Sequence, residues 1–129
     1  MKNTLTVLLV FFLTACQSNS SKESQIHEKL LGFKTKIFAD LGDEKYNKYE
    51  KKADKGNVKI KYIHDIIYVS YYAELNACGE YQGNIDVKND SIILELNLVS
   101  DEVCTSLRID RITFLIDNPD EKNKIIVKK

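Results

Sequence analysis

Regular alternation of apolar and polar residues dominates the second half of this chain and most constrains its fold. Val58, Ile60 and Tyr62 are separated by Lys59 and Lys61, and similar alternating runs follow. A period of two is typical of a β-strand that buries one face. We therefore expect about six strands, over residues 58–62, 67–75, 81–87, 92–98, 107–116 and 125–127.

The connections between these runs predict antiparallel neighbours. His64-Asp65 and residues 88–90 (Lys-Asn-Asp) are short polar breaks of the kind that form tight turns. Leu107 and Ile109 follow one phase of alternation, whereas the apolar residues from Ile112 onward follow the other. A phase reversal within one strand predicts a β-bulge, here near Asp110-Arg111.

Before the strands, the apolar residues recur at helical spacing. Residues 24–41 carry an apolar stripe at intervals of three and four, with Ser24 as a candidate N-cap and Gly42 as a stop. A second, more polar helical stretch includes Tyr46 and Ala53 and ends near Gly56-Asn57. The stripe of the first predicted helix consists of Ile26, Leu30, Phe33, Ile37 and Leu41.

These patterns predict an α+β domain over residues 24–129. We expect one or two N-terminal helices followed by an antiparallel β-meander of about six strands, packed on the helix or curled into a sandwich or partial barrel. Lys+Arg and Asp+Glu both number 19, so no net charge attracts nucleic acid over a distance. We accordingly expect no nucleic-acid partner.

The first fifteen residues have the features of a signal peptide. Lys2 precedes an uncharged run from Leu5 to Leu13, which is shorter than the roughly 20 residues that span a bilayer. The next residues complete the sequence Leu13-Thr14-Ala15-Cys16, which resembles the lipobox of bacterial lipoproteins. The alternatives are an ordinary signal peptide or a small N-terminal anchor, with Cys16 incidental.

The resemblance to lipoproteins implies where the protein is located. It implies that the Cys16 sulfur receives a diacylglyceryl group, that cleavage removes residues 1–15, and that the new amine is acylated. Residues 16–23 would then form the lipidated cysteine and a polar tether. The implied location is the bacterial cell envelope, on the outer membrane if the cell has one, because Gln17 is not an aspartate.

Cys78 and Cys104 remain as a pair once Cys16 is assigned to the lipid. Export places them in an oxidising compartment, and we expect a disulfide that closes a loop of about 26 residues. A metal site, a redox pair or a catalytic thiol would need neighbours that the sequence lacks: His27 and His64 have no ligand spacing, and no Cys-x-x-Cys occurs.

Polar residues near the turns do not form a recognisable catalytic or metal site. His64 and Asp65 are explained by a turn, and no nucleophile stands beside them. Asp86, Asn89, Asp90 and Ser91 lack the ordered spacing and central glycine of a calcium loop. We expect no catalytic residue, metal or cofactor.

Tyrosines are concentrated in the first three predicted strands. Tyr68, Ser70, Tyr72 and Glu74 share one strand face, which we take as a candidate binding surface. The alternative is that the N-terminal helix covers this face and the tyrosines serve packing.

Three functional hypotheses remain. The first is a non-enzymatic binding or accessory domain, held at the membrane by its lipid, with an envelope protein as a candidate partner. The second is an envelope inhibitor or immunity-type protein that blocks a lytic enzyme or toxin. The third, a small hydrolase around His64 and Asp65, lacks a catalytic constellation.

Overall fold

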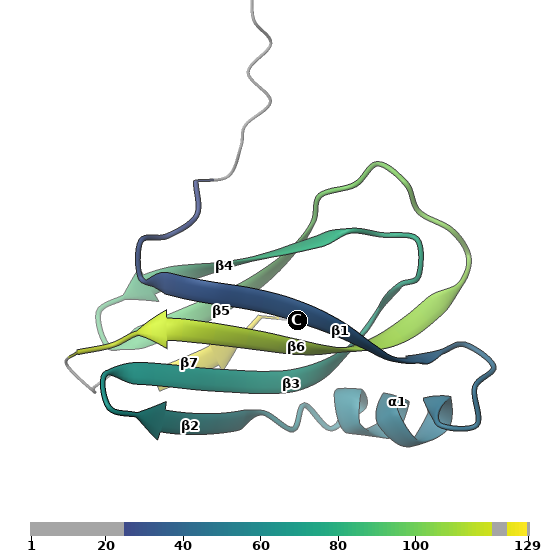
Figure 1. Ribbon diagram of the computed structural model, residues 1–129, viewed down its shortest axis with the longest axis horizontal. Helices are drawn as coiled ribbons and strands as arrows, with labels where there is room; N and C mark the ends of the chain where they lie inside the picture. The colour runs from purple at the N-terminus through teal and green to yellow at the C-terminus, as the bar shows by residue number, and fades with distance from the viewer. Residues whose placement is uncertain (1–24, 120–123, 129) are drawn as a thin grey trace, which may run out of the picture.

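Two facing sheets and one short helix make up the part of the chain that the structure, a computed structural model, describes: residues 25–119 and 124–128. A four-stranded sheet has the order β1-β6-β3-β2, and a three-stranded sheet has the order β4-β5-β7 (Figure 1). The elements are β1 (Leu30–Asp40), α1 (Tyr46–Asp54), β2 (Lys59–Ile63), β3 (Ile66–Asn76), β4 (Tyr81–Lys88), β5 (Ser91–Leu98), β6 (Leu107–Asp117) and β7 (Lys124–Val127).

The helix predicted over residues 24–41 is wrong, because β1 occupies most of this segment. β1 pairs antiparallel with β6 from Leu30 opposite Ile116 to Asp40 opposite Arg108. Helical spacing of apolar residues did not mark a buried stripe here, since Ile37 and Leu41 are both more than half exposed. The segment also carries Gly32 and several β-branched or aromatic residues, which disfavour a helix, and the long pairing with β6 decides the conformation. Ser24 lies outside the described residues.

The shorter helix predicted around Tyr46 and Ala53 is confirmed as α1. The domain is therefore α+β, but its helix follows the first strand and covers only one end of the large sheet, beside β3 and β6 (Figure 1).

The predicted hairpins form, but the strands do not follow one another as a simple meander. β2 pairs with β3 across His64-Asp65, and β4 pairs with β5 across Asn89, with positive φ angles of 55° at His64 and 40° at Asn89. β3, however, pairs with β6, and the C-terminal β7 pairs parallel to β5. The described strands form two separate sheets and do not close into a barrel.

The β-bulge predicted near Asp110-Arg111 is wrong for β6, which pairs with β3 without interruption. The irregularity lies in the partner strand β1, between Ile37 and Ala39. The apolar phase of β6 reverses because its two faces have different neighbours. Ile109 packs against Ala39 and Tyr46 of the helix-covered face, whereas the alternate residues from Ile112 to Ile116 enter the core between the sheets.

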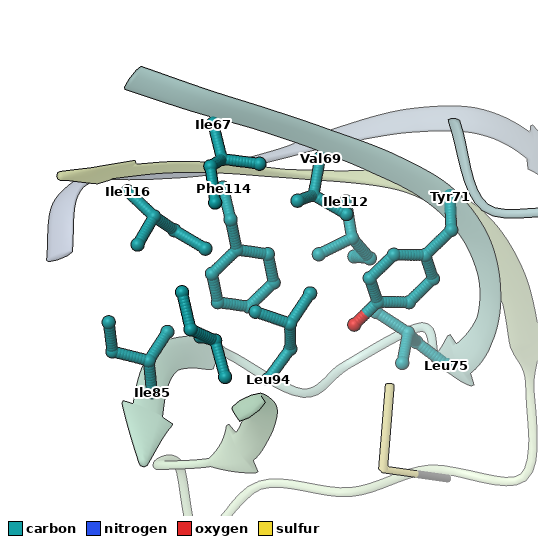
Figure 2. Packing of buried hydrophobic residues seen from close by; sticks show 10 residues of the cluster. Ile67, Val69, Tyr71, Leu75, Ile85, Leu94, Ile112, Phe114 and Ile116 are labelled. Atoms are coloured by element: carbon teal, nitrogen blue, oxygen red, sulfur yellow. The ribbon is translucent and has the colours of Figure 1, made fainter. Parts of the chain in front are cut away.

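The main core is formed by inward-facing residues of both sheets. Figure 2 shows Ile67, Val69 and Tyr71 of β3 directed toward Ile85 and Leu94 of the smaller sheet. The other buried members of this cluster are Leu75, Ile92, Ile112, Phe114 and Ile116.

On one side the sheets are closed by an aromatic contact between β1 and β4. The Phe33 ring lies edge-on to Phe114, with centroids 5.1 Å apart, and covers Gly83 of β4. A Cβ at Gly83 would overlap the Phe33 ring, so a glycine is required for this close approach.

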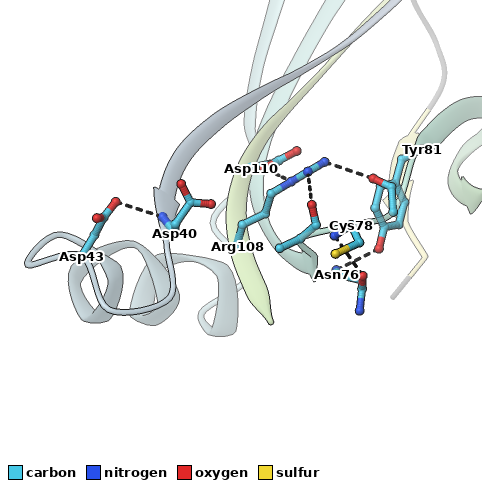
Figure 3. Close-up of polar contacts among 9 residues, drawn as sticks. Asp40, Asp43, Asn76, Cys78, Tyr81, Arg108 and Asp110 are labelled. Carbon is cyan, nitrogen blue, oxygen red and sulfur yellow. Dashed lines mark hydrogen bonds and ion pairs between the residues drawn. The ribbon is translucent and has the colours of Figure 1, made fainter. Parts of the chain in front are cut away.

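The predicted disulfide joins the loops at one end of the two sheets. Cys78 and Cys104 are bonded, and the Asn76 side chain accepts hydrogen bonds from both of their backbone N–H groups at 3.1 Å. Beside them, Arg108 Nε donates to Asp110 Oδ1 at 3.0 Å, and its other nitrogens donate to the carbonyls of Ala77 and Gly79 (Figure 3). Asp110 is fully buried.

In residues 25–119 and 124–128, no helix has the length and apolar character needed to cross a membrane.

Candidate functional site

The predicted surface of Tyr68, Ser70, Tyr72 and Glu74 lies on the outer face of the large sheet. These residues alternate along β3 with Ile67, Val69 and Tyr71, which enter the core. Tyr68 and Tyr72 are partly buried, Ser70 is buried and Glu74 is exposed. The four side chains therefore share a face but differ in what covers them.

The helix α1 covers the end of this face that carries Tyr72 and Glu74. The Tyr46 hydroxyl donates to Glu74 Oε2 at 2.8 Å, and the Tyr49 ring packs on Tyr72 with centroids 5.0 Å apart. Burial, followed by the hydrogen bond to Glu74, raises the pKa of Tyr46 to about 12. Glu74 is thus engaged by the helix, while half-buried Tyr68 and buried Ser70 form the half of the face that α1 does not cover.

Basic side chains surround the aromatic cluster of Phe38, Tyr49 and Tyr72. Lys52 Nζ lies 4.8 Å from the Tyr49 ring centroid and 5.4 Å from that of Tyr72. Arg111 Cζ lies 5.3 Å from the Phe38 centroid. Contacts of this length are within the range of favourable cation–π interactions, so the rings hold these cations in place.

The register of the strands places further lysines on the same face. Residues opposite one another in antiparallel strands project to the same side, and Ser70 lies between Thr113 of β6 and Lys59 of β2. Tyr72 lies opposite Arg111, and Tyr68 lies opposite Lys61. The basic residues that share this face or border it from α1 are Lys34, Lys36, Lys52, Lys59, Lys61 and Arg111.

A cavity of about 340 Å³ opens beside the half of the face that α1 does not cover. Arg111 is recessed in it: its Nε is buried and has no hydrogen-bond partner among the described residues. No ion pair engages Lys52, Lys59 or Arg111 within that part of the chain. The cavity is lined by Lys52, Asn57, Val58, Lys59, Tyr68, Ser70, Tyr71, Tyr72 and Arg111, with no acidic residue among them.

The electrostatics of Tyr68 reflect these neighbours. The Ser70 hydroxyl, then the Thr113 hydroxyl and the charges of Arg111 and Lys59, lower the pKa of Tyr68 despite some desolvation. The same groups that favour a phenolate oxygen would favour any oxyanion placed there. The outer face is therefore a basic surface with hydrogen-bond donors around a recessed guanidinium, which we call the basic face.

Sequence reasoning found the tyrosines of this site but missed its cations. The sequence pattern places Arg111 at a bulge and gives Lys59 and Lys61 no role beyond alternating with apolar residues in a strand. The alternation of Lys59 and Lys61 with Val58 and Ile60 shows that these lysines share one strand face. Only the strand register shows that this face also carries Tyr68 and Ser70.

The remaining candidate residues lie away from the basic face. His64 and Asp65 form the exposed β2–β3 turn, and Asp86, Asn89, Asp90 and Ser91 belong to the β4–β5 hairpin, where Asp86 pairs with Lys88 at 3.0 Å. Cys16 lies outside the described residues. Within those residues, no group of three or more histidine, cysteine or acidic side chains is arranged to hold a metal ion.

Comparison with known proteins gives no relative: no family model, curated protein or solved structure matches the chain.

Proposed function

We propose that this protein is a lipid-anchored, non-enzymatic binding protein of the bacterial cell envelope, and that its basic face binds a phosphate-bearing polymer. The observation that carries the binding proposal is the convergence of Arg111, Lys52 and Lys59, none of them ion-paired among the described residues, on one cavity. The chain has equal numbers of basic and acidic residues, yet basic side chains are concentrated on one face of its large sheet.

The donor set suits a phosphate group. A phosphate presents several strong acceptor oxygens, and a guanidinium, ammonium groups and hydroxyls can approach these from different directions. Arg111, Lys52 and Lys59 supply the charge, while Tyr68 and Ser70 supply neutral donors.

The recessed position of Arg111 favours a protruding group over a flat surface. Arg111 is half-buried and its Nε is buried, so a protruding ligand group can contact the guanidinium from within the cavity. A phosphate on a flexible envelope polymer can do so, whereas the plane of a bilayer surface would meet the exposed lysines first.

A soluble poly(glycerol phosphate) tests the binding proposal. The full-length protein in nanodiscs of phosphatidylcholine should bind it in a salt-dependent manner, and Arg111→Gln or the pair Lys52→Gln/Lys59→Gln should weaken binding about tenfold or more. Lys124→Gln is the matched control, because it removes an exposed charge from the small sheet. Equal loss in the control, or binding only to vesicles that contain phosphatidylglycerol, would overturn the proposal.

The anchor has a separate test at Cys16, the cysteine of the lipobox. We expect Cys16→Ser to abolish incorporation of labelled fatty acid and to release or mislocalise the protein, because one sulfur carries the diacylglyceryl group. Cys104→Ala controls for loss of a cysteine without loss of the lipobox. Unchanged labelling of Cys16→Ser would refute the anchor.

A further inference from the structure

A cleft separates the two sheets on the side opposite the Phe33–Gly83 contact. There β2 and β7 are the edge strands of their sheets, and no described strand bridges them (Figure 1). The cleft has a volume of about 570 Å³, which lies within the range of roughly 300–1,000 Å³ typical of small-molecule sites.

The walls of this cleft are mainly aliphatic. On the side of the large sheet and of the segment just before β2, the lining residues are Val58, Ile60 and Leu75. On the side of the small sheet they are Leu96, Ile125 and Val127. Such walls favour a slender apolar molecule over a polar one, because the lining can offer dispersion contacts and little hydrogen bonding.

One hydroxyl group is directed into the apolar cleft. Tyr71 is only 8% exposed, lines the cleft, and points from β3 toward the small sheet (Figure 2). Its hydroxyl makes no hydrogen bond to any described residue. Burial raises the pKa of Tyr71 to about 12, so the group is a neutral O–H donor at physiological pH. A ligand in the cleft with an acceptor oxygen would accept a hydrogen bond from this O–H group.

The charges at the rim select against an anionic ligand. The Glu74 carboxylate is directed away from the cleft, toward Tyr46 on the outer face of β3. Lys128, the one basic residue among the described residues that line the cleft, pairs with Glu95 at 3.2 Å. Among the described residues that line the cleft, an acidic head group would therefore meet no cation without an ion-pair partner.

We propose that this cleft binds the acyl chain of an uncharged ester, with the chain between the sheets and the ester carbonyl accepting a hydrogen bond from Tyr71. The cleft shares Val58, Tyr71 and Tyr72 with the cavity of the basic face, but the phosphate proposal rests on Lys52, Lys59 and Arg111, which do not line the cleft. Ala73, which lines the cleft from the same strand, provides a position at which a larger side chain would occupy it.

Photo-crosslinking of the full-length protein in phosphatidylcholine nanodiscs tests this proposal. The probe is a diazirine-bearing fatty acid methyl ester, and the adducts are mapped by peptide mass spectrometry. We expect adducts on β5 and β7 near Leu96 and Val127. Ala73→Leu should reduce them at least fivefold, and Tyr71→Phe should reduce them severalfold without changing the shape of the cleft. Tyr62→Phe, at an exposed position of β2, is the matched control.

Two further outcomes decide the nature of the ligand. The free fatty acid bearing the same diazirine should label the cleft less than the ester, and equal or stronger labelling would overturn the uncharged character of the ligand. Adducts scattered over exposed strands, or adducts unchanged in both Tyr71→Phe and Ala73→Leu, would overturn the site itself. Tyr71→Phe retains the ring that packs near Phe114, so the test holds even if Ala73→Leu fails to fold.

Discussion

The Tyr46 hydroxyl donates a 2.8 Å hydrogen bond to the carboxylate of Glu74, and this contact joins α1 to β3. We expect Tyr46→Phe to lower the free energy of unfolding by about 1–2 kcal/mol, because a hydrogen bond to a charged acceptor is lost while the ring remains. Urea denaturation of the purified protein measures the change. Tyr62→Phe, at an exposed tyrosine, should leave stability unchanged, and an equal loss there would argue against the role of Glu74.

The same hydroxyl gives the protein an alkaline limit. The pKa of Tyr46 rises from 10.0 to about 12 on folding, so the proton is held more tightly in the folded state. The corresponding stability is fully present below pH 10 and is lost as the pH rises toward about 12. Denaturation midpoints recorded across this interval should fall for the wild type and fall less for Tyr46→Phe. Parallel curves for the two proteins would contradict this assignment.

Arg108 neutralises the fully buried carboxylate of Asp110 at the disulfide end of the sheets. Arg108→Met should cost about 3–5 kcal/mol at neutral pH, because it leaves a buried charge without its partner. Burial already raises the pKa of Asp110 despite the attraction of Arg108, and loss of Arg108 raises it further.

The sign of the pH dependence follows from that raised pKa. A carboxyl whose pKa is higher when folded favours folding at acid pH and loses this contribution as the pH rises through the folded pKa. The penalty of Arg108→Met should therefore be smaller at about pH 4 than at about pH 8 in urea titrations. A penalty that is constant with pH would show that lost packing, and not the unpaired charge, is responsible.

Gly83 allows the Phe33 ring to lie directly against β4. Gly83→Ala should destabilise the protein by about 1–3 kcal/mol, since the added methyl group forces the ring or the strand to move. Gly32→Ala is the matched control, because its Cβ would meet only the Leu115 side chain at an ordinary contact distance of 3.4 Å. Thermal unfolding of both variants measures the difference, and equal effects would contradict the steric argument.

The Cys78–Cys104 disulfide closes a loop between residues separated by 26 positions. Replacing both cysteines with alanine should lower the free energy of unfolding by about 3 kcal/mol, mainly by releasing the unfolded chain. Denaturation of the double variant tests this value. Mass analysis of the native protein without reductant should show two hydrogens fewer than the dithiol form, and an unchanged mass after reduction would contradict the bond.

The sequence allowed the local pairings to be predicted and left the long-range ones unresolved. The hairpin turns at His64-Asp65 and Asn89 depend on neighbouring residues, and both form. The pairing of β1 with β6 joins residues some eighty positions apart, and nothing within residues 24–41 records that partner. The helix prediction for residues 24–41 failed because an edge strand with a bulge spaces its apolar residues at the same intervals as a helix.

For the candidate site, too, the sequence predicts the local part and leaves the long-range part unresolved. Alternation along β3 placed Tyr68, Ser70 and Tyr72 on one face from local information alone. The contribution of Arg111 depended on β6 lying beside β3, and that of Lys52 depended on α1 folding back over Tyr72. Charge that is dispersed along a chain becomes a surface feature only when the order of the strands is known.

The pairing of β1 with β6 also has a consequence for how the protein is made. A chain that is synthesised amino end first presents β1 early, but the partner that satisfies its backbone groups arrives only with residues 107–117. β5 likewise waits for β7, whose last residue is Val127, before its second edge is covered. Assembly of both sheets is thus deferred until β6 and β7 have been synthesised, and the unfinished intermediate carries open strand edges that chaperones would need to shield.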